Sequence, residues 1–254
     1  GWTDDRGSSF AITGRLFNAD TGAPADPTEG NDTLTGTPGD DVLNGLGGDD
    51  SIAGLDGSDT LIGGTGNDTI IGGETGADLR DVIYGGDGDD SIDGGYGNDE
   101  LRGDDGNDTI IGGFGTDTVI GGAGNDALTG QAWSDLIFGG DGDDFINGGF
   151  GHDRLNGGTG ADRFYHLGVA GHGSDWVQDD GAAAGDLLLF GQAGATRDQF
   201  QVNLTETANA GVAGVEEAFV IYRPTGQIMW ALVDGGGQDH INLVLGGETF
   251  DLLS

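Results

Sequence analysis

The sequence predicts an all-β protein whose main part is a parallel β-solenoid, and two observations lead to this prediction. Between residues 29 and 165 an aspartate recurs every nine residues, and an apolar residue stands two positions after each aspartate. Gly and Asp fill many of the other positions, and both are poor helix and strand formers. A nine-residue period does not line a helix face, so we expect each unit to be a turn followed by a very short strand whose middle residue points inward.

The repeat comprises fifteen units, counted on the aspartate at the sixth position. Successive aspartates are nine residues apart except for one 13-residue step, from Asp68 to Asp81. Two units form a coil with one strand on each side of a thin core, and about seven stacked coils at ~4.8 Å each make a rod of roughly 34 Å. The predicted core residues are Leu34, Leu43, Ile52, Leu61, Ile70, Ile83, Ile92, Leu101, Ile110, Val119, Leu128, Ile137, Ile146, Leu155 and Phe164.

The charge of the chain limits its partners. Of 254 residues 45 are acidic and 8 are basic, which gives a net charge of −37. We expect no binding of nucleic acid, which is bound through basic patches, and no membrane insertion, since no apolar run reaches the length of a transmembrane helix. Residues 30–165 carry 28 acidic side chains and 4 Arg, a net charge of −24, so the carboxylates repel one another. Each nine-residue unit buries only one apolar side chain, which is too little to offset the entropy lost on ordering the unit. We therefore expect cations to stabilise the fold.

Three units show the repeat most clearly: GGTGNDTII (63–71), GGYGNDELR (94–102) and GGAGNDALT (121–129). They resemble the G-G-x-G-x-D-x-U-x nonapeptide of the RTX (repeats-in-toxin) family, and the resemblance covers residues 29–165. It implies a right-handed parallel β-roll in which calcium ions lie between stacked turns, with Asp side chains bridging successive ions. Fifteen units give at most about thirteen such pairs of turns, and thirteen Ca²⁺ ions would nearly cancel the charge of the repeats.

Calcium suits these turns, because it takes six to eight oxygen ligands from carboxylates and backbone carbonyls, whereas magnesium rarely gives up its waters to an all-protein site. Gly at positions one, two and four permits positive φ, so successive carbonyls can turn toward one point. The expected carboxylate ligands are Asp32, Asp41, Asp50, Asp59, Asp68, Asp81, Asp90, Asp99, Asp108, Asp117, Asp126, Asp135, Asp144, Asp153 and Asp162. The expected carbonyl ligands are Gly36, Gly45, Gly63, Gly66, Gly85, Gly88, Gly94, Gly97, Gly103, Gly106, Gly112, Gly115, Gly121, Gly124, Gly139, Gly142, Gly148, Gly151 and Gly157.

Besides the first unit, which lacks the opening Gly pair and is expected to cap one end, two units depart from the pattern. In residues 72–84 either Asp78 or Asp81 could stand at the sixth position; we expect Asp81, because Ile83 then keeps the core register while residues 74–79 loop out. In residues 130–138 the fourth position is Trp133, where a positive φ is costly. We expect this turn to hold its ions least securely.

The third position differs between alternate units. It is aromatic in three even-numbered units (Tyr96, Phe114 and Phe150) and acidic in three odd-numbered ones (Asp87, Asp105 and Asp141). Since alternate units lie on opposite edges, we expect one aromatic and one acidic edge. The rings could cover glycine-rich turns, dock the segment from Gly191 to Gly214, or serve self-association or a surface partner; we expect the docking.

The two ends of the chain differ from the repeats. Residues 166–254 resemble the β cap that follows the rolls of type I secreted RTX proteins, with Asp175, Val177, Asp179 and residues 185–188 as the matching phrase. We expect Trp176 and Trp230 to anchor its core. The last five residues, FDLLS, resemble an uncleaved type I export signal. Residues 1–28 resemble the tail of an upstream β repeat followed by a linker, which implies a longer parent protein.

The search for a catalytic site finds none: the chain has no Cys, and its four histidines form no H-E-x-x-H pair. We therefore expect no enzyme but a calcium-binding module of a secreted bacterial protein, extracellular or on the cell surface. It would fold on calcium after export by type I secretion machinery and have an adhesive or surface role. The alternative is the C-terminal calcium-binding and secretion domain of a secreted protease, lipase or epimerase, which the sequence upstream of Gly1 would distinguish.

Overall fold

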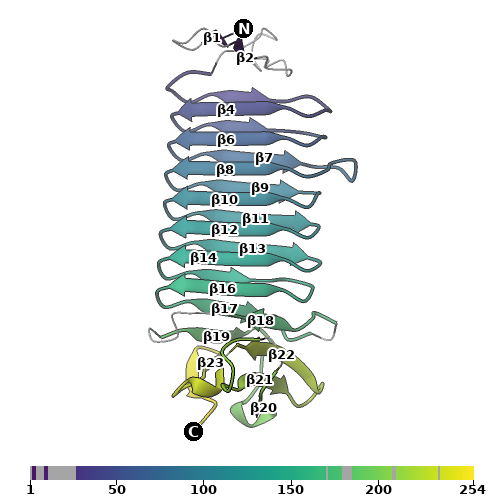
Figure 1. Ribbon diagram of the computed structural model, residues 1–254, viewed down its shortest axis with the longest axis vertical. Helices are drawn as coiled ribbons and strands as arrows, with labels where there is room; N and C mark the ends of the chain where they lie inside the picture. The colour runs from purple at the N-terminus through teal and green to yellow at the C-terminus, as the bar shows by residue number, and fades with distance from the viewer. Residues whose placement is uncertain are drawn as a thin grey trace.

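A computed structural model describes residues 2–3, 9–10, 27–169, 171–178, 185–207, 210–233 and 235–254. The described chain is a stack of β-strands with the C-terminal segment at one end (Figure 1). In the N-terminal segment β1 (Trp2–Thr3) and β2 (Ser9–Phe10) form an antiparallel pair. The rest of the upstream repeat and linker expected over residues 1–28 lies outside the described residues, apart from residues 27 and 28.

The repeats form two parallel sheets that face each other, as the nine-residue period predicts. One sheet contains β4 (Val42–Gly47), β6 (Thr60–Thr65), β8 (Val82–Asp87), β10 (Glu100–Asp105), β12 (Thr118–Ala123), β14 (Leu136–Asp141) and β16 (Arg154–Thr159). The other contains β3 (Thr33–Thr35), β5 (Ser51–Ala53), β7 (Thr69–Gly73), β9 (Ser91–Gly95), β11 (Thr109–Phe114), β13 (Ala127–Ala132), β15 (Phe145–Asn147) and β17 (Arg163–His166). Equivalent residues pair, so Leu101 lies beside Ile83 and Val119.

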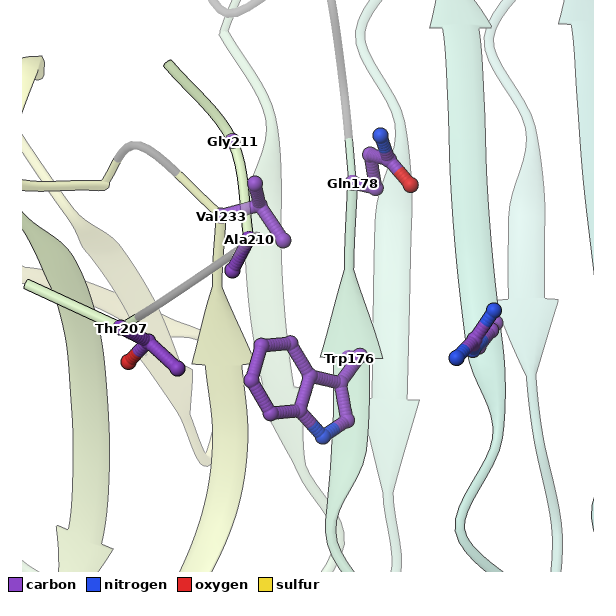
Figure 2. A pocket seen from close by; sticks show the side chains of 7 residues that line it. Trp176, Gln178, Thr207, Ala210, Gly211 and Val233 are labelled. Atoms are coloured by element: carbon purple, nitrogen blue, oxygen red, sulfur yellow. The ribbon is translucent and has the colours of Figure 1, made fainter. Parts of the chain in front are cut away.

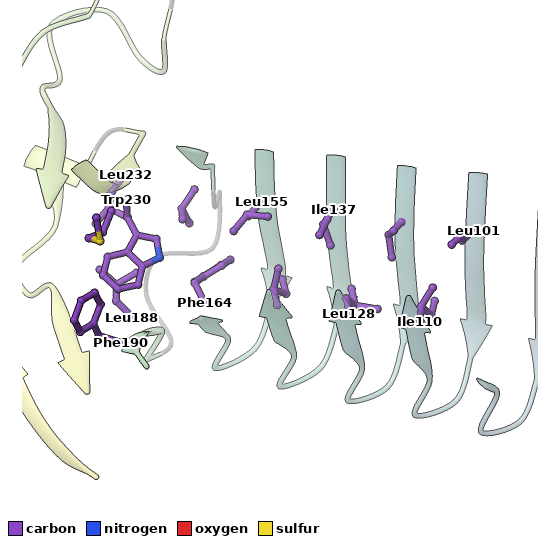
Figure 3. Packing of buried hydrophobic residues seen from close by; sticks show 14 of the residues in the cluster. Leu101, Ile110, Leu128, Ile137, Leu155, Phe164, Leu188, Phe190, Trp230 and Leu232 are labelled. Carbon is purple, nitrogen blue, oxygen red and sulfur yellow. The ribbon is translucent and has the colours of Figure 1, made fainter. Parts of the chain in front are cut away.

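The core is one column of apolar side chains between the two sheets. Every predicted core residue from Leu34 to Phe164 is at most 2% exposed. In Figure 3, which shows part of this column, Leu101 and Ile137 point inward from one sheet, and Ile110 and Leu128 point inward from the other. The prediction of the inward residue in each unit is therefore confirmed, and the fold is the predicted all-β parallel solenoid.

The strands are longer than the sequence predicts. In β10 the parallel ladder runs beyond the core residue Leu101 to Asp104 and Asp105, the second and third positions of the next unit. Glycine at the first position permits this, because a side chain there would collide with the next coil: a Cβ on Gly103 would lie 2.7 Å from the Gly121 carbonyl oxygen. Neighbouring coils thus override the low strand propensity of these glycines.

The C-terminal region continues both sheets. The first is extended by β18 (Asp175–Val177), β22 (Gln227–Leu232), β21 (Glu217–Tyr222) and β20 (Phe200–Thr205), and the second by β19 (Leu187–Phe190), β23 (Asn242–Leu245) and β24 (Glu248–Asp251). Two short 3₁₀ turns, η1 (Arg197–Gln199) and η2 (Gly235–Gly237), connect them. No helix among the described residues is long and apolar enough to cross a membrane.

The core of the C-terminal region is aromatic. Phe190 packs edge-on against Phe200, with 4.9 Å between ring centroids, and Tyr222 lies 5.2 Å from Phe200. Trp230 is fully buried in the same cluster, which confirms that it is a core anchor. The apolar column of the repeats therefore continues without interruption into the C-terminal region (Figure 3).

Candidate metal centre

The sixth-position aspartates form two columns, one along each edge of the roll. The backbone N–H of Asp90 donates to Oδ1 of Asp108 at 2.8 Å, and Asp108 N–H donates to Oδ1 of Asp126 at 2.8 Å. The same bond links each predicted aspartate ligand, from Asp32 to Asp144, to its equivalent one coil later. The structure therefore brings the predicted carboxylates together edge by edge.

The second carboxylate oxygen of most of these residues is buried and has no hydrogen-bond partner among the described residues. This holds for Oδ2 of Asp50, Asp59, Asp68, Asp81, Asp90, Asp99, Asp108, Asp117, Asp126, Asp135, Asp144 and Asp153. A buried carboxylate oxygen without a donor or a cation is costly, because the charged form loses its hydration. The arrangement therefore requires either protons or cations along each column.

Backbone oxygens converge on the same points. A Cβ on Gly85 would overlap Oδ2 of Asp90 and lie 2.8 Å from the carbonyl oxygen of Gly103, so these two oxygens from successive coils face one small space. At the fourth position a Cβ on Gly106 would overlap the carbonyl oxygen of Gly88, which points along the stack from the preceding coil. Carboxylate and carbonyl oxygens gathered at one turn are the ligand set that calcium prefers. The residues thus fit the ion.

Most of the predicted carbonyl ligands face an adjacent turn in this way. Carbonyl oxygens that would contact a Cβ of a neighbouring coil include those of Gly63, Gly66, Gly85, Gly88, Gly94, Gly97, Gly103, Gly106, Gly112, Gly121, Gly124, Gly139, Gly142, Gly148, Gly151 and Gly157. The carbonyls of Gly36, Gly45 and Gly115 have no glycine opposite them among the described residues, so the same relation does not extend to them. Sequence reasoning missed the equivalent carbonyls of Gly54, Gly72 and Gly130, although each stands at the first position of its unit.

Burial and mutual repulsion raise the pKa of aspartates in the two columns and so favour their protonated form. Burial, together with the neighbouring aspartates Asp81 and Asp117, raises the pKa of Asp99 to about 8. The pKa of Asp90 is raised to about 7, again by burial first and then by Asp108 and Asp68. A cation between successive carboxylates reverses both effects, because it favours the charged form.

Few of the oxygens at each turn belong to side chains. No group of three or more His, Cys, Asp or Glu side chains that could hold a metal ion occurs in the described part of the chain. Each turn presents one sixth-position carboxylate beside glycine carbonyls, so the candidate site combines single carboxylates with backbone oxygens and contains no cluster of acidic side chains. The Gly spacing was the signal that pointed to it.

The first two units differ from the rest. Thr28 donates from its backbone N–H to Oδ2 of Asp32 at 2.6 Å, and Thr37 donates in the same way to Oδ2 of Asp41 at 2.5 Å. Both threonine hydroxyls contact the same oxygens. In the first two units, threonine donors therefore bond to the sixth-position Oδ2 atoms, whereas in most later units the equivalent Oδ2 atom has no hydrogen-bond partner among the described residues.

The long unit follows the expected register. Asp59 N–H donates to Oδ1 of Asp81 at 2.7 Å, and Asp81 N–H donates to Oδ1 of Asp99 at 2.9 Å, so Asp81 stands at the sixth position. Ile83 is fully buried beside it. Asp78 is also buried, and its Oδ2 faces Gly73 without a hydrogen-bond partner among the described residues. This inserted carboxylate therefore points back into the turn.

Trp133 adopts the costly conformation that its position demands, with φ of 91°. Its side chain is 68% exposed, and the turn is otherwise regular: Asp117 N–H donates to Oδ1 of Asp135, and Asp135 N–H to Oδ1 of Asp153, each at 2.9 Å. The aspartate column thus passes through this unit without a break.

The aromatic edge is real but is not covered by the C-terminal segment. Tyr96 and Phe114 stack with 4.7 Å between ring centroids, and Phe150 lies 4.8 Å from the ring of His172. The three aromatic side chains remain 36%, 50% and 53% exposed, so the expectation that a later segment docks over them is wrong. Residues 200–205, from that segment, instead pair with β21 at the far end of the first sheet.

Trp176 also differs from its prediction. In β18 it alternates with the buried residues Asp175 and Val177, so its ring faces outward and is only partly buried. A cavity of about 270 Å³ opens beside it, where the C-terminal region meets the repeats (Figure 2). The cavity is lined by Arg154, Trp176, Gln178, Thr207, Ala210, Gly211 and Val233. Asp179 of the same phrase lies outside the described residues.

Comparison with known proteins agrees with this geometry. No curated protein is significantly similar to the chain. A family model, the RTX calcium-binding nonapeptide repeat (4 copies), matches residues 26–61, 53–74, 75–110, 93–128 and 134–164, which together are more than half of the chain. With its glycine turns, its buried aspartate columns and this match, the chain belongs to the family of RTX calcium-binding repeat proteins.

Proposed function

We propose that this chain is a calcium-dependent folding module of a secreted bacterial protein. Calcium ions occupy the spaces between successive turns, at most about thirteen in the roll, and the chain folds on calcium after type I export. The proposal is supported above all by the buried Oδ2 atoms that repeat along both edges, such as those of Asp90 and Asp108.

Folding and calcium are coupled because the sites exist only in the stacked coil. Each site takes oxygens from two units that are 18 residues apart in most of the roll, and these are far apart in an unfolded chain. The free energy of ion binding therefore becomes free energy of folding. Extracellular calcium modules work at millimolar calcium, whereas the cytosol holds far less, so the chain would stay unfolded until it leaves the cell.

The C-terminal residues support this order of events. Leu252 is buried, its N–H donates to the Ile241 carbonyl at 2.8 Å, and Arg197 donates to the Leu252 carbonyl at 2.9 Å. In the folded chain the apolar part of the proposed export signal is thus packed against the C-terminal region. An exporter would reach it only before folding. Deleting residues 250–254 should abolish secretion by a type I exporter without changing calcium-induced folding.

Circular dichroism of the full chain tests the coupling. Without calcium the far-ultraviolet spectrum should be that of a disordered chain, and millimolar calcium should restore the strand signal cooperatively. The same concentration of magnesium should not, because magnesium retains its waters. Equal strand content with and without calcium would refute the proposal.

A further inference from the structure

The repeat continues beyond the residues that the family model matches. Residues 170–178 read AGHGSDWVQ, and their positions two, four, six and eight are Gly, Gly, Asp and Val, as in the nonapeptide. The family match ends at residue 164. This segment does not follow the nine-residue spacing, because 13 residues separate Asp162 from Asp175. The same 13-residue step separates Asp68 from Asp81 inside the roll.

The backbone of this segment repeats the unit before it on the same edge. Gly171 has φ of 83°, close to the 92° of Gly149 one coil earlier. Gly173 forms a parallel bridge with Gly151 and has φ of 112°. Val177 pairs with the core residue Leu155. The segment therefore has the turn and the inward side chain of a repeat unit.

Asp175 extends the aspartate column by one residue. The Asp153 N–H donates to Oδ1 of Asp175 at 3.4 Å, as Asp135 N–H does to Asp153 at 2.9 Å. Asp153 and Asp175 are both fully buried, and Oδ2 of each has no hydrogen-bond partner among the described residues. Two adjacent buried carboxylates with free oxygens require a proton or a cation.

A backbone oxygen faces the same turn. A Cβ on Gly173 would overlap the carbonyl oxygen of Gly151, which is the relation that fourth-position glycines have throughout the roll. The first-position Gly148 leaves room beside Oδ2 of Asp153 in the same manner as Gly130 beside Asp135. The junction thus presents the carboxylates of Asp153 and Asp175 and one carbonyl oxygen, that of Gly151, at the end of the column; Ala170, at the first position of the segment, lies outside the described residues.

We propose that residues 171–178 form a sixteenth calcium-binding unit, in which Asp175 and the turn of Asp153 share an ion at the junction between the roll and the C-terminal region. This inference rests on the proposed function. Asp175 pairs along the sheet with Trp230, the largest fully buried side chain of the C-terminal core. The ion therefore links packing of that core to calcium, and the C-terminal region becomes a calcium-dependent element rather than a passive cap.

The test compares Asp175→Asn with Asp143→Asn in the full chain. Asparagine keeps the acceptor for the Asp153 N–H but removes the charge. Asp143 is an exposed fifth-position residue whose Oδ1 accepts from Ala161 N–H, and other units carry Asn at that position, so Asp143→Asn controls for loss of one charge. Equilibrium dialysis at saturating calcium should show one ion fewer for Asp175→Asn than for the wild type and for Asp143→Asn. The calcium midpoint of the tryptophan fluorescence change should also shift upward for Asp175→Asn alone.

The outcomes separate the two proposals. An unchanged ion count and an unchanged fluorescence midpoint for Asp175→Asn overturn the sixteenth unit while leaving the roll as a calcium module. A wild-type chain that binds no calcium overturns the proposed function itself. If Asp175→Asn does not fold, terbium sensitised by tryptophan decides: Trp176→Phe should lose part of the emission, because Trp176 is adjacent to Asp175. Emission equal to that of the wild type would overturn the proposal.

Discussion

The carboxylate of Asp108 serves two coils at once: its Oδ1 accepts the Asp90 N–H at 2.8 Å, while its Oδ2 is buried beside Gly103 without a hydrogen-bond partner among the described residues. One oxygen therefore fixes the register of the stack, and under the proposed function the other binds an ion. Asp108→Asn should keep the first function and lose the second. We expect its calcium midpoint to rise about tenfold, since a hydrogen bond or contact to a charged group contributes about 1.5–3 kcal/mol.

Asp135→Asn is the matched comparison in the unit that contains Trp133. The sequence alone predicts a smaller effect there, because the turn was expected to be disturbed. The intact column through Asp135 instead leads us to expect a midpoint shift similar to that of Asp108→Asn. Calcium titrations followed by circular dichroism check this, and a clearly smaller shift for Asp135→Asn would favour the sequence-based ranking.

Gly103→Ala tests whether the space at the first position belongs to an ion. The backbone of Gly103 is not left-handed, so alanine meets no conformational penalty there, but its Cβ would overlap Oδ2 of Asp108 and lie 2.7 Å from the Gly121 carbonyl oxygen. We expect a higher calcium midpoint and at least one bound ion fewer. Gly76→Ala, in the inserted loop where a Cβ would have no neighbour within 4 Å, should behave as the wild type. Equal behaviour of the two variants would argue against the site.

Trp133→Gly should stabilise the calcium-loaded protein. A left-handed conformation costs a side-chain-bearing residue about 1–2 kcal/mol, of which the greater backbone entropy of glycine offsets about 0.5–1 kcal/mol. The exposed indole contributes little burial, so we expect a net gain of roughly 0.5–1 kcal/mol. Urea unfolding at saturating calcium measures it. A loss of stability would mean that the ring has a partner on the roll.

The fold of the repeats could be read from the sequence because one rule is applied fifteen times. Leu101, Ile110 and Val119 are inward for the same reason, and an error at one would be visible at the others. The pairing of β22 with β18 could not be read, because it joins segments more than 50 residues apart without a repeat between them. Asp175, which we propose as a ligand, was not among the expected ligands for a related reason: its 13-residue step is followed by no further regular unit, whereas Asp81 is followed by nine.

The aromatic edge gives a prediction about stability and association. The Tyr96–Phe114 stack has ring planes 15° apart, and such a pair contributes about 0.5–1.5 kcal/mol beyond its buried area. Phe114→Ala should therefore lower the free energy of unfolding by about 1 kcal/mol. Ala132→Phe, which adds a ring between Phe114 and Phe150, should raise the free energy of unfolding.

Self-association through the aromatic edge stays a prediction. Sedimentation of the calcium-loaded wild type should show assemblies that Phe114→Ala weakens, and a monomeric wild type would contradict it.

Acid should partly replace calcium. Burial and neighbouring carboxylates raise the pKa of Asp108 to about 6, of Asp144 to about 7 and of Asp135 to about 8 in the calcium-free fold, above the ordinary value near 3.8. A raised carboxyl pKa means that folding favours the protonated form, so this stability is fully present below pH ~4 and is lost as the pH rises through about 6 to 8. Calcium-free protein should therefore show more strand signal by circular dichroism at pH 5 than at pH 8. Protons and calcium also compete for the same oxygens, so the midpoint of calcium binding, measured by equilibrium dialysis rather than by circular dichroism, should rise as the pH falls through this window. A strand signal that is unchanged or weaker at pH 5, or a calcium-binding midpoint that falls, would show that the buried columns do not control folding.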